Sequence, residues 1–375
     1  MLNPQQFLDV LCGQGIGFYA GVPDSLLKDF CACLSVQPAS RLRAVTAANE
    51  GAAVALAAGH YMASGKPALV YMQNSGEGNA VNPLASLTDP DVYGIPVLLL
   101  IGWRGQPGVH DEPQHVKQGR ITLPLLEVLG IPYAILDKDP QQVQRQIDLA
   151  MASMLESRSP YALVVEKGTF SAFEAPATTV FPLSLTRETA VQCVAAAMGP
   201  KDVLVSTTGM ASRELFEYRE AAGQGHGRDF LCVGAMGHAS QIALGIAMEQ
   251  PWRRVWCLDG DGALLMHLGS LATIAGEKPS AFVHILLNNG VHDSVGGQPT
   301  AAAHVDFPGM ARAAGYPYAS SADSREALLD TLSRLPEQGP VFLEVKLHPG
   351  HRKDLGRPTS TPRENLSALM DFLQQ

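Results

Sequence analysis

The chain has 375 residues, 46% of them apolar, and its 27 basic and 36 acidic residues give a formal net charge of −9. That length predicts at least two domains, each with a sizeable core. The acidic balance argues against a nucleic-acid-binding protein, which needs a basic surface. The longest apolar run, residues 95–103, is too short to span a bilayer and contains Pro96 and Gly102. A membrane protein is therefore also disfavoured.

The N-terminus and the cysteines indicate a cytosolic protein. Residues 1–4 carry no charged segment and no small-residue cleavage site, so we do not expect a secretory signal. None of the six cysteines forms a Cys-x-x-Cys pair, and all lie in apolar surroundings. We expect buried free thiols rather than disulfides or a structural zinc site.

Short apolar segments alternate with helical patterns along the first 167 residues, as in sheets of buried parallel strands. The predicted strands are Gly17–Ala20, Leu42–Val45, Ala68–Met72, Val97–Ile101, Tyr133–Leu136 and Tyr161–Val165. Helices are expected after Asn3-Pro4, over Asn49–Ser64, and from Asp139-Pro140 to about Leu155, where Asn or Asp precedes or caps the first turn. This alternation predicts a doubly wound α/β domain.

Residues 168–184 interrupt the alternation, because they contain Pro176 and Pro182 and show little periodicity. Strands are predicted again at Val203–Ser206, Phe230–Val233, Val255–Leu258, Phe282–Leu287 and Val341–Val345. We therefore expect two doubly wound α/β domains, residues 1–167 and 185–375, joined by a linker over 168–184.

The most informative motif is Gly-Asp-Gly, with Asp261 between Gly260 and Gly262, where an apolar strand meets a helix. Glycines and a helix N-terminus suit a bound phosphate. Asn289 ends the next strand, 28 residues later, at the same edge of the predicted sheet. A carboxylate, an amide oxygen and a backbone carbonyl are hard ligands that suit Mg²⁺ shared with phosphate oxygens. The alternative is an ordinary turn with a capping Asp.

With these motifs the chain resembles the thiamine-diphosphate enzyme family, in which Gly-Asp-Gly precedes Asn-Asn. The resemblance implies that Asp261, Asn289 and the carbonyl of Val291 bind Mg²⁺, which bridges to the diphosphate. It also implies that Glu50, in Ala-Ala-Asn-Glu-Gly-Ala-Ala, meets N1′ of the aminopyrimidine. There a carboxyl group promotes the tautomer that removes the proton from thiazolium C2. Without the resemblance, Glu50 is a first-turn glutamate favoured by the helix dipole.

Further segments match the cofactor-binding regions of the family. In Gly-Ala-Met-Gly-His-Ala (234–239), Met236 corresponds to the wedge that bends the cofactor, although a core methionine is the plain alternative. A glycine-rich loop over residues 73–79 corresponds to the loop near the pyrimidine, although a strand-to-helix turn with an Asn cap is its plain alternative. The implied cofactor-binding residues are Glu50, Asn74, Gly76, Gly209, Met236, Gly237, His238, Gly260, Asp261, Gly262, Ala263 and Asn289.

The absence of a third domain between the two halves narrows the choice within the family. Segments 21–28, 111–115 and 289–300 resemble the phosphonopyruvate decarboxylases and, next, the sulfopyruvate decarboxylases. The resemblance implies decarboxylation of 3-phosphonopyruvate in phosphonate biosynthesis. Two alternatives stay open: a sulfopyruvate or other 2-oxo-acid decarboxylase, and a cofactor-binding, non-catalytic partner subunit of a carboligase. The presence of both Glu50 and the metal ligands counts against the second.

Asp24, His115, His292 and Asp293 are the candidates for acid–base work after CO₂ leaves. The larger decarboxylases of the family carry a Glu six residues beyond the metal-binding Asn, where this chain has Val295, so His292 or Asp293 takes that role here. The plain alternatives are that Asp24 caps a helix beginning near Ser25 and that His115 is a surface histidine.

The dianionic phosphonate needs fixed cations despite the acidic net charge. Arg104, Lys117, Arg120 and Arg213 are candidates, with Ser25 beside them, and solvated surface charge is the alternative for each. The family also shares each cofactor between the first half of one chain and the second half of another, which implies at least a homodimer with shared active sites.

Overall fold

The computed structural model describes residues 1–174 and 183–375, which form two compact units, Met1–Thr178 and Thr179–Gln375. Most of the predicted linker, residues 175–182 of 168–184, lies outside the described residues, so the exact domain limits stay a prediction. In the part of the chain that is described, no helix has the length and apolarity needed to cross a membrane.

The first unit contains one six-stranded parallel sheet with the order β2-β1-β3-β4-β6-β5. Its strands are β1 (Phe18–Gly21), β2 (Arg43–Thr46), β3 (Ala68–Gln73), β4 (Val97–Gly102), β5 (Tyr133–Ile135) and β6 (Tyr161–Val165). All six strands predicted in this half are present within a residue or two. The most central pair, β3 and β4, is almost wholly buried, which explains its continuous apolar sequence.

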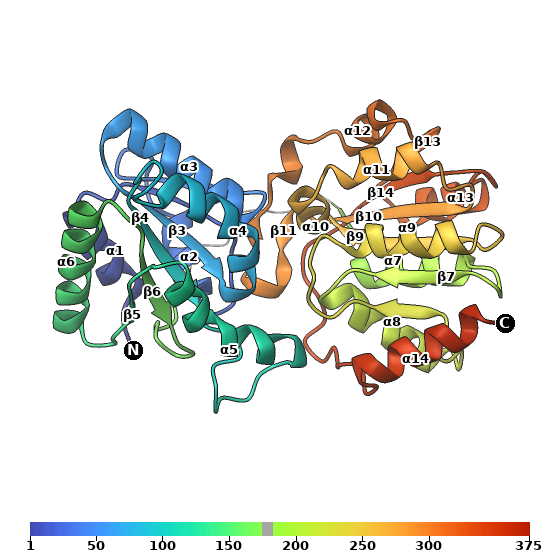
Figure 1. Ribbon diagram of the computed structural model, residues 1–375. Helices are drawn as coiled ribbons and strands as arrows, with labels where there is room; N and C mark the ends of the chain where they lie inside the picture. The colour runs from blue at the N-terminus through green and yellow to red at the C-terminus, as the bar shows by residue number, and fades with distance from the viewer. Residues whose placement is uncertain (175–182) are drawn as a thin grey trace. The chain divides into compact units, whose positions relative to one another are not determined.

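Six α-helices accompany this sheet in the described part of the unit. They are α1 (Pro4–Gly13), α2 (Lys28–Ser35), α3 (Glu50–Ser64), α4 (Glu77–Pro83), α5 (Pro113–Val128) and α6 (Pro140–Ser157). The predicted cap Asn3 is confirmed, and Asn49 and Asp139 cap their helices in the same way, each accepting a hydrogen bond from a first-turn N–H group. The helices cover both faces of the sheet (Figure 1), with α1, α2 and α6 in one apolar cluster and α3 and α4 in the other.

The second unit contains a six-stranded parallel sheet with the order β13-β14-β10-β9-β7-β8 and a short hairpin, β11-β12. Its strands are β7 (Val203–Ser206), β8 (Asp229–Leu231), β9 (Val255–Gly260), β10 (Phe282–Asn288), β11 (Val291–His292), β12 (Gln298–Pro299), β13 (Tyr318–Ala322) and β14 (Val341–Lys346). The five predicted strands are confirmed. The edge strand β13 and the hairpin were not predicted.

Helices again cover both faces of this sheet (Figure 1). They are α7 (Arg187–Ala197), α8 (Met210–Ala221), α9 (Ala239–Glu249), α10 (Asp261–Met266), α11 (Ser270–Glu277), α12 (Phe307–Ala314), α13 (Arg325–Ser333) and α14 (Pro362–Leu373). Side chains of β9 alternate between the two faces: Trp256 and Leu258 pack with α7, α8 and α13, whereas Val255 and Cys257 pack with α9, α11 and α12. Two doubly wound α/β units are thereby confirmed.

Each sheet has one point at which the order of its strands reverses. In the first unit the chain leaves β1 toward β2 but leaves β3 toward β4, and in the second it leaves β7 toward β8 but β9 toward β10. Open α/β sheets bind ligands outside the carboxyl ends of the strands at such points. The residues that follow these four strands, Asp24, Asn74, Thr207 and Asp261 among them, are therefore where a site is expected.

The cysteine prediction is confirmed for the described residues. All six thiols are free, and all are buried except Cys12, which is partly buried. Burial raises the pKa of the Cys31, Cys232 and Cys257 thiols, so these are inert core side chains rather than nucleophiles.

Candidate active site

Glu50 is the first residue of α3, immediately after the cap Asn49, whose side chain accepts a 2.8 Å hydrogen bond from the Ala52 N–H. Its side chain is directed inward rather than to solvent, because only 4% of the residue is exposed. Oε2 accepts a 2.8 Å hydrogen bond from Asn79 Nδ2, and burial raises the pKa of Glu50. Glu50 is therefore more than a first-turn glutamate that the helix dipole favours. Its burial also favours the protonated form of the carboxyl.

The turn after β3 covers Glu50 closely. A Cβ added to Gly76 would lie 2.2 Å from Glu50 Oε1, so this position accommodates no side chain while the carboxyl stays in place. Asn74 is fully buried and does not cap a helix; its Nδ2 donates to the Arg104 carbonyl at 2.8 Å and to Thr122 Oγ1 at 2.9 Å. Asn74 therefore ties the turn to the loop after β4.

Asp24 lies in the loop after β1 and is fully buried. Its Oδ2 accepts a 3.0 Å hydrogen bond from the Leu26 N–H, and α2 begins only at Lys28, so the helix-capping alternative is wrong. The missing side chain of Gly102 makes room for the carboxyl, because a Cβ there would lie 2.1 Å from Oδ2. Burial raises the pKa of Asp24 to about 6.

Arg104 links Asp24's neighbour Ser25 to the loop after β4. Its Nη1 donates to Ser25 Oγ at 2.6 Å, and its Nε donates to Asp111 Oδ2 at 2.7 Å. Partial burial alone would raise the pKa of Asp111, but the hydrogen bonds from Arg104 and from two backbone N–H groups hold it well below its usual range. Arg104 is thus a fixed guanidinium with a carboxylate on one side and a hydroxyl on the other.

Within the described part of the first unit, Lys117 and Arg120 make no hydrogen bond or ion pair with Asp24 or Ser25. Lys117 and Arg120 are exposed on α5, on a different face of the helix from its buried residues, and Arg213 belongs to α8 of the second unit. Among the described residues, Arg104 is the candidate whose contacts place it beside Ser25.

His115 is buried in the first turn of α5, with 8% of the residue exposed, so the surface-histidine alternative is wrong. Burial lowers the pKa of His115, which favours the neutral form of its ring. Its Nδ1 has no hydrogen-bond partner within the described ranges. A buried ring nitrogen without a partner is available to a bound ligand.

In the second unit Asp261 begins α10 directly where β9 ends, and only 2% of it is exposed. Its Oδ2 accepts a hydrogen bond from the Thr300 hydroxyl, and the backbone N–H of Asn289 also donates to the carboxylate. Burial nevertheless raises the pKa of Asp261 to about 6. A desolvated carboxylate of this kind is stabilised by a cation.

Asn289 follows β10 and is 8% exposed. Its Nδ2 donates to Asp293 Oδ2 at 2.7 Å, and its Oδ1 accepts from the Val291 N–H at 3.2 Å. Val291 pairs with Pro299 in the hairpin. Because proline has no N–H, Pro299 cannot donate a hydrogen bond to the Val291 carbonyl.

Glycines shape the loops around Asp261. Gly209 and Gly237 have φ values of 101° and 85°, in the left-handed region. A Cβ added to Gly262 would lie 2.8 Å from His292 Cε1 and 3.4 Å from Met236 Cε, so both side chains lie over the start of α10. Ala263, the next residue, is buried.

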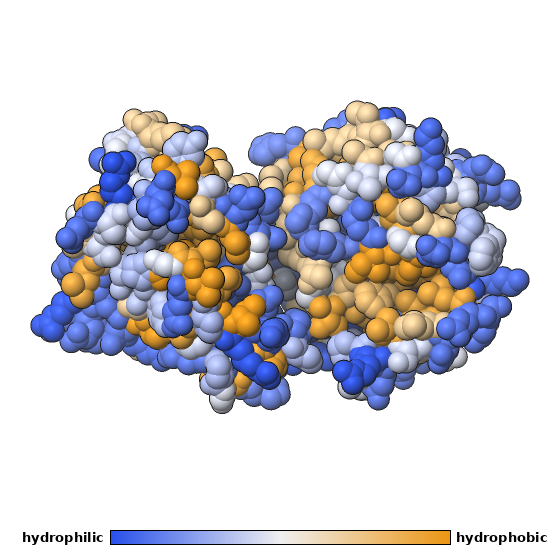
Figure 2. Space-filling view, in the orientation of Figure 1, coloured by the Kyte–Doolittle hydropathy of each residue, from blue (hydrophilic) through white to orange (hydrophobic). Residues whose placement is uncertain are grey.

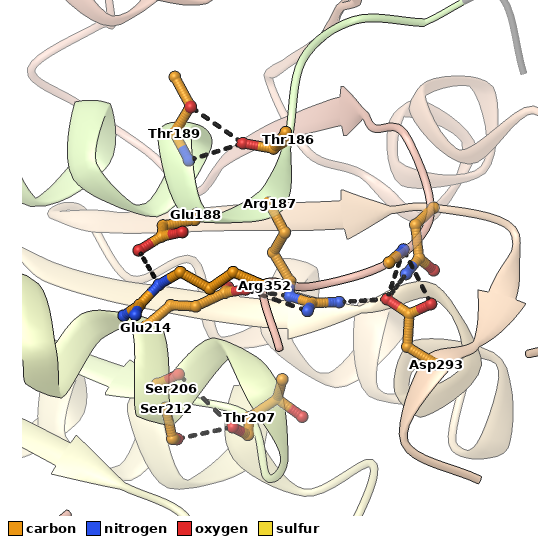
Figure 3. Close-up of polar contacts among 12 residues, drawn as sticks. Thr186, Arg187, Glu188, Thr189, Ser206, Thr207, Ser212, Glu214, Asp293 and Arg352 are labelled. Carbon is orange, nitrogen blue, oxygen red and sulfur yellow. Dashed lines mark hydrogen bonds and ion pairs between the residues drawn. The ribbon is translucent and has the colours of Figure 1, made fainter. Parts of the chain in front are cut away.

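The two histidines near this loop differ. Burial lowers the pKa of His292 to about 4, so its ring is neutral at neutral pH. His238 is exposed, and its Nδ1 lies 3.1 Å from the Met236 carbonyl, which ties it to the loop before α9. Asp293, by contrast, is engaged with Arg187 at 2.7 Å (Figure 3) and with Asn289, contacts that favour a structural role over proton transfer.

Some residues of the site had no signal in the sequence. Thr300, Asn79 and Arg187 each contact a predicted site residue, yet none belongs to a motif of its own. Asn79 and Thr300 lie at the ends of segments that were singled out for other residues, which is the only signal that could have found them.

The two groups of residues fit the two ends of thiamine diphosphate. The buried carboxyl of Asp261 with the amide of Asn289 is a hard-oxygen donor set for Mg²⁺, and glycine-containing loops of the kind that suit a phosphate lie beside it. The buried carboxyl of Glu50 fits a ring nitrogen such as N1′ of the aminopyrimidine.

Comparison with known proteins agrees with this fit. Residues 4–123 match the N-terminal thiamine pyrophosphate (TPP) binding domain of thiamine pyrophosphate enzymes, and residues 207–345 match their C-terminal TPP binding domain. The chain belongs to the thiamine pyrophosphate enzyme family, with its two cofactor-binding domains and no match to a middle domain.

Within that family its relatives are decarboxylases. A phosphonopyruvate decarboxylase of Streptomyces hygroscopicus is 35% identical, over 99% of this chain and 94% of the relative. One of Streptomyces viridochromogenes is 36% identical, over 97% and 93%. A sulfopyruvate decarboxylase of Methanosarcina acetivorans is 27% identical, over 100% and 98%. The chain is accordingly a thiamine-diphosphate-dependent carboxy-lyase.

Proposed function

We propose that this enzyme converts 3-phosphonopyruvate to phosphonoacetaldehyde and CO₂. The C1–C2 bond of the substrate breaks, the carboxylate leaves as CO₂, a proton is added at C2, and the carbon–phosphorus bond is retained. The observation that carries the proposal is the similarity at 35–36% identity, over nearly the whole of both chains, to two phosphonopyruvate decarboxylases.

The residues of the chain have separate tasks in this proposal. Thiamine diphosphate, when bound, supplies the group that accepts the electron pair of the breaking C1–C2 bond. Asp261, Asn289 and the Val291 carbonyl would hold Mg²⁺, and Met236 would support the bound cofactor. Glu50 holds and returns a proton at N1′, which its burial and its raised pKa favour.

The residues that follow β1 and β4 bind the substrate in this proposal. Arg104 and Ser25 bind the phosphonate, because they form a fixed cation and hydroxyl in contact with each other. Asp24, with a pKa of about 6, exchanges the proton at C2, and His115 offers its unpartnered Nδ1 to the same ligand.

Two other functions, a sulfopyruvate decarboxylase and a non-catalytic subunit of a carboligase, compete with this proposal. A sulfopyruvate decarboxylase would use the same machinery, since a sulfonate is also a tetrahedral anion, but the identity to that relative is lower, 27%. A non-catalytic partner subunit of a carboligase has no need of a complete set of residues, whereas Glu50, Asp261 and Asn289 are all present here in buried, bonded positions.

The enzyme acts, in this proposal, as a homo-oligomer in which one chain supplies Glu50 and another supplies Asp261. The outward face of α3, the helix that begins with Glu50, supports association with a second copy. This face is apolar. Many of its residues are small, and the side chains of two larger ones, Leu56 and Met62, are 39% and 72% exposed. A groove beside it is lined by Phe18, Ala52, Ala55, Leu56, Gly59 and His60. Figure 2 shows orange, apolar side chains at the surface in the region where Figure 1 draws α3.

The substrate and the free thiols suggest where the enzyme works. Phosphonoacetaldehyde retains the carbon–phosphorus bond, so we place the reaction in phosphonate biosynthesis. Six unpaired cysteines are typical of the reducing cytoplasm, which is the compartment we propose.

A substrate panel tests the proposed specificity. Phosphonopyruvate, sulfopyruvate and pyruvate are assayed with Mg²⁺ and thiamine diphosphate, and CO₂ and aldehyde are both measured. We expect kcat/KM to be highest for phosphonopyruvate, and lowest for pyruvate, which lacks the second anion. A higher kcat/KM for sulfopyruvate would replace our proposal by its first alternative.

A further inference from the structure

The carboxylate of Asp293 receives hydrogen bonds from three segments that lie far apart in the sequence. Asn289 Nδ2 donates to Oδ2 at 2.7 Å, and Arg187 Nη1 donates to the same oxygen at 2.7 Å. The Gly350 N–H contacts both oxygens, at 3.0 and 3.2 Å. Figure 3 shows Asp293 facing Arg187, which comes from the first turn of α7.

Arg187 is itself fixed on its other side. Its Nε and Nη2 donate to the two carboxylate oxygens of Glu214 at 2.9 and 3.1 Å, and 7% of Arg187 and 2% of Glu214 are exposed. A guanidinium held between two carboxylates in this way has little freedom to rotate, because each of its three nitrogens already donates a hydrogen bond. Asp293 is therefore held at a fixed place beside Asn289.

The contact with Asp293 decides which way the Asn289 amide points. A carboxylate only accepts hydrogen bonds, so the amide nitrogen of Asn289 must face Asp293 and the amide oxygen must face away from it. An amide binds Mg²⁺ through its oxygen and not through its nitrogen. The orientation imposed by Asp293 is the one that a metal ligand needs.

We propose that Asp293 and Arg187 are positioning residues that orient Asn289 for Mg²⁺, with the segment after β14 completing their support. That segment is anchored at both ends: Gly350 contacts Asp293, and the Gly356 N–H donates to Glu217 Oε1 at 2.6 Å. Between them Arg352 pairs with Glu188 at 2.9 Å (Figure 3) and with Glu217.

In the sequence, the supporting residues lie outside the range that matches the C-terminal TPP binding domain. Arg187 precedes residues 207–345, and Gly350 follows them. The inference rests on the proposed Mg²⁺ site and assigns Asp293 a role different from proton transfer. It adds Arg187 and Gly350 to the residues on which metal binding depends.

The test measures metal binding directly, without substrate. Mg²⁺ is titrated calorimetrically into the apo-protein at saturating thiamine diphosphate, for the wild type and for Asp293→Asn, Arg187→Met and Arg187→Lys. We expect Asp293→Asn to bind Mg²⁺ about 10–100-fold more weakly, the usual cost of losing a partner of a metal ligand. Its new amide would offer an N–H₂ group to Asn289 or Arg187, which also donate. Arg187→Lys keeps the charge and one donor, so it should lose less than Arg187→Met.

A second buried Arg–Asp pair of the same unit provides the matched control. Arg219 donates to both oxygens of Asp229 at 2.8 and 3.0 Å, both residues are fully buried, and neither contacts a proposed metal ligand. Asp229→Asn and Arg219→Lys should lower the Tm of the apo-protein but leave the half-saturating Mg²⁺ concentration within about twofold of the wild type.

Three results would overturn the inference. One is wild-type Mg²⁺ affinity in Asp293→Asn and Arg187→Met. Another is an equal loss of affinity in the Asp229 and Arg219 variants, which would make the effect one of general stability. The third is a wild-type protein that binds no Mg²⁺, which would also remove the proposed metal site; the first two leave the proposed decarboxylation intact.

Discussion

Desolvation of carboxyl groups is the common feature of the residues proposed for chemistry. Glu50, Asp24 and Asp261 are each at most 4% exposed, and burial raises the pKa of all three. Arg104 in the Asp24 cluster is engaged with Asp111, and Glu50 has an amide rather than a cation as partner. Such groups cost stability in the free protein and gain from a bound ligand that carries the complementary charge or proton.

Glu50→Gln separates proton transfer from binding. Glutamine keeps the size of the side chain and a hydrogen bond to Asn79, but it cannot hold and return a proton. We expect kcat to fall by about 10²–10⁴-fold, with cofactor affinity and Tm close to those of the wild type. The measurement is the rate of C2 proton exchange of the bound cofactor by NMR, and exchange at the wild-type rate would refute the assigned role.

Asp24→Asn tests the cost of the buried charge through its pH dependence. The pKa of Asp24 is about 6 when folded and 3.8 in the ordinary reference, so between these values the folded state binds more protons than the unfolded state. Stability due to this group is therefore present below about pH 4 and lost as the pH rises through 6. The loss at pH 7.5 is about 3 kcal/mol, and asparagine removes it.

The free energy of urea unfolding of the apo-protein, measured at pH 7.5 and pH 4.5, checks this expectation. Relative to the wild type, Asp24→Asn should gain stability at pH 7.5 and lose most of that gain at pH 4.5. Asp111→Asn should lose stability by a similar amount at both pH values, because the folded pKa of Asp111 is lowered and its contribution is lost only as the pH falls below the unfolded pKa of 3.8. A difference for Asp24→Asn that does not change with pH would contradict the account.

The residues that the sequence predicted are those whose neighbours along the chain carry the signal. Asp261 lies between two glycines at the end of an apolar strand, and Glu50 follows a capping Asn. Arg187, Thr300 and Asn79 reach their partners through contacts over 106, 39 and 29 residues. Such contacts are set by tertiary packing, which a single sequence does not display.

Turns that bring a backbone close to a functional side chain are the main determinant at the level of elements. Gly76 lies between β3 and α4 and leaves no room for a methyl group beside Glu50. At the start of α10, Gly262 likewise has no side chain where the side chains of His292 and Met236 lie. In each case the absence of a side chain fixes where a neighbouring side chain lies.

Gly76→Ala is expected to displace the Glu50 carboxyl, because the new Cβ would lie 2.2 Å from Oε1. We predict a fall in kcat of about 10²-fold or more, as for a misplaced acid–base group. Gly78→Ala, two residues later in the first turn of α4, is the matched control, since nothing lies within 4 Å of its added Cβ. Steady-state kinetics of both variants decide the matter; equal activity would show that the turn does not hold Glu50.

Most of the strands that sequence patterns predicted are largely buried; β2 and β5, at the two edges of the first sheet, were predicted although they are not. The segments Val97–Gly102 and, up to Leu258, Val255–Gly260 are continuous apolar runs because both faces of each sheet are covered. The strand β13, with the sequence Tyr-Ala-Ser-Ser-Ala, lies at the edge of its sheet and pairs only with β14. Its polar composition gave no apolar run to detect, and the hairpin β11-β12 is too short for any period to show.

At the scale of the whole molecule, the proposed chemistry is divided between two units. Glu50 and Asp24 belong to the first, whereas Asp261 and Asn289 belong to the second. Neither unit holds a complete set, so activity depends on how the two kinds of unit meet. In our proposal they meet between copies of the chain.

Subunit mixing tests that arrangement. A Glu50→Gln chain and an Asp261→Ala chain should each be inactive alone. After dissociation and reassociation in equal amounts, half of the dimers are mixed and each mixed dimer has one intact site, so about one site in four should be active. If mass spectrometry shows mixed dimers and no activity returns, each site is built within one chain and the shared arrangement is wrong.

The central claim is most directly tested by following phosphonopyruvate by ³¹P NMR in the presence of the purified chain, Mg²⁺ and thiamine diphosphate. We predict conversion to phosphonoacetaldehyde with one equivalent of CO₂ and no inorganic phosphate. Dialysis against a chelator should stop the reaction, and Mg²⁺ or Mn²⁺ should restore it, since both prefer octahedral oxygen ligands. Unchanged phosphonopyruvate, or full activity of the chelator-treated protein without added metal and cofactor, would contradict the account.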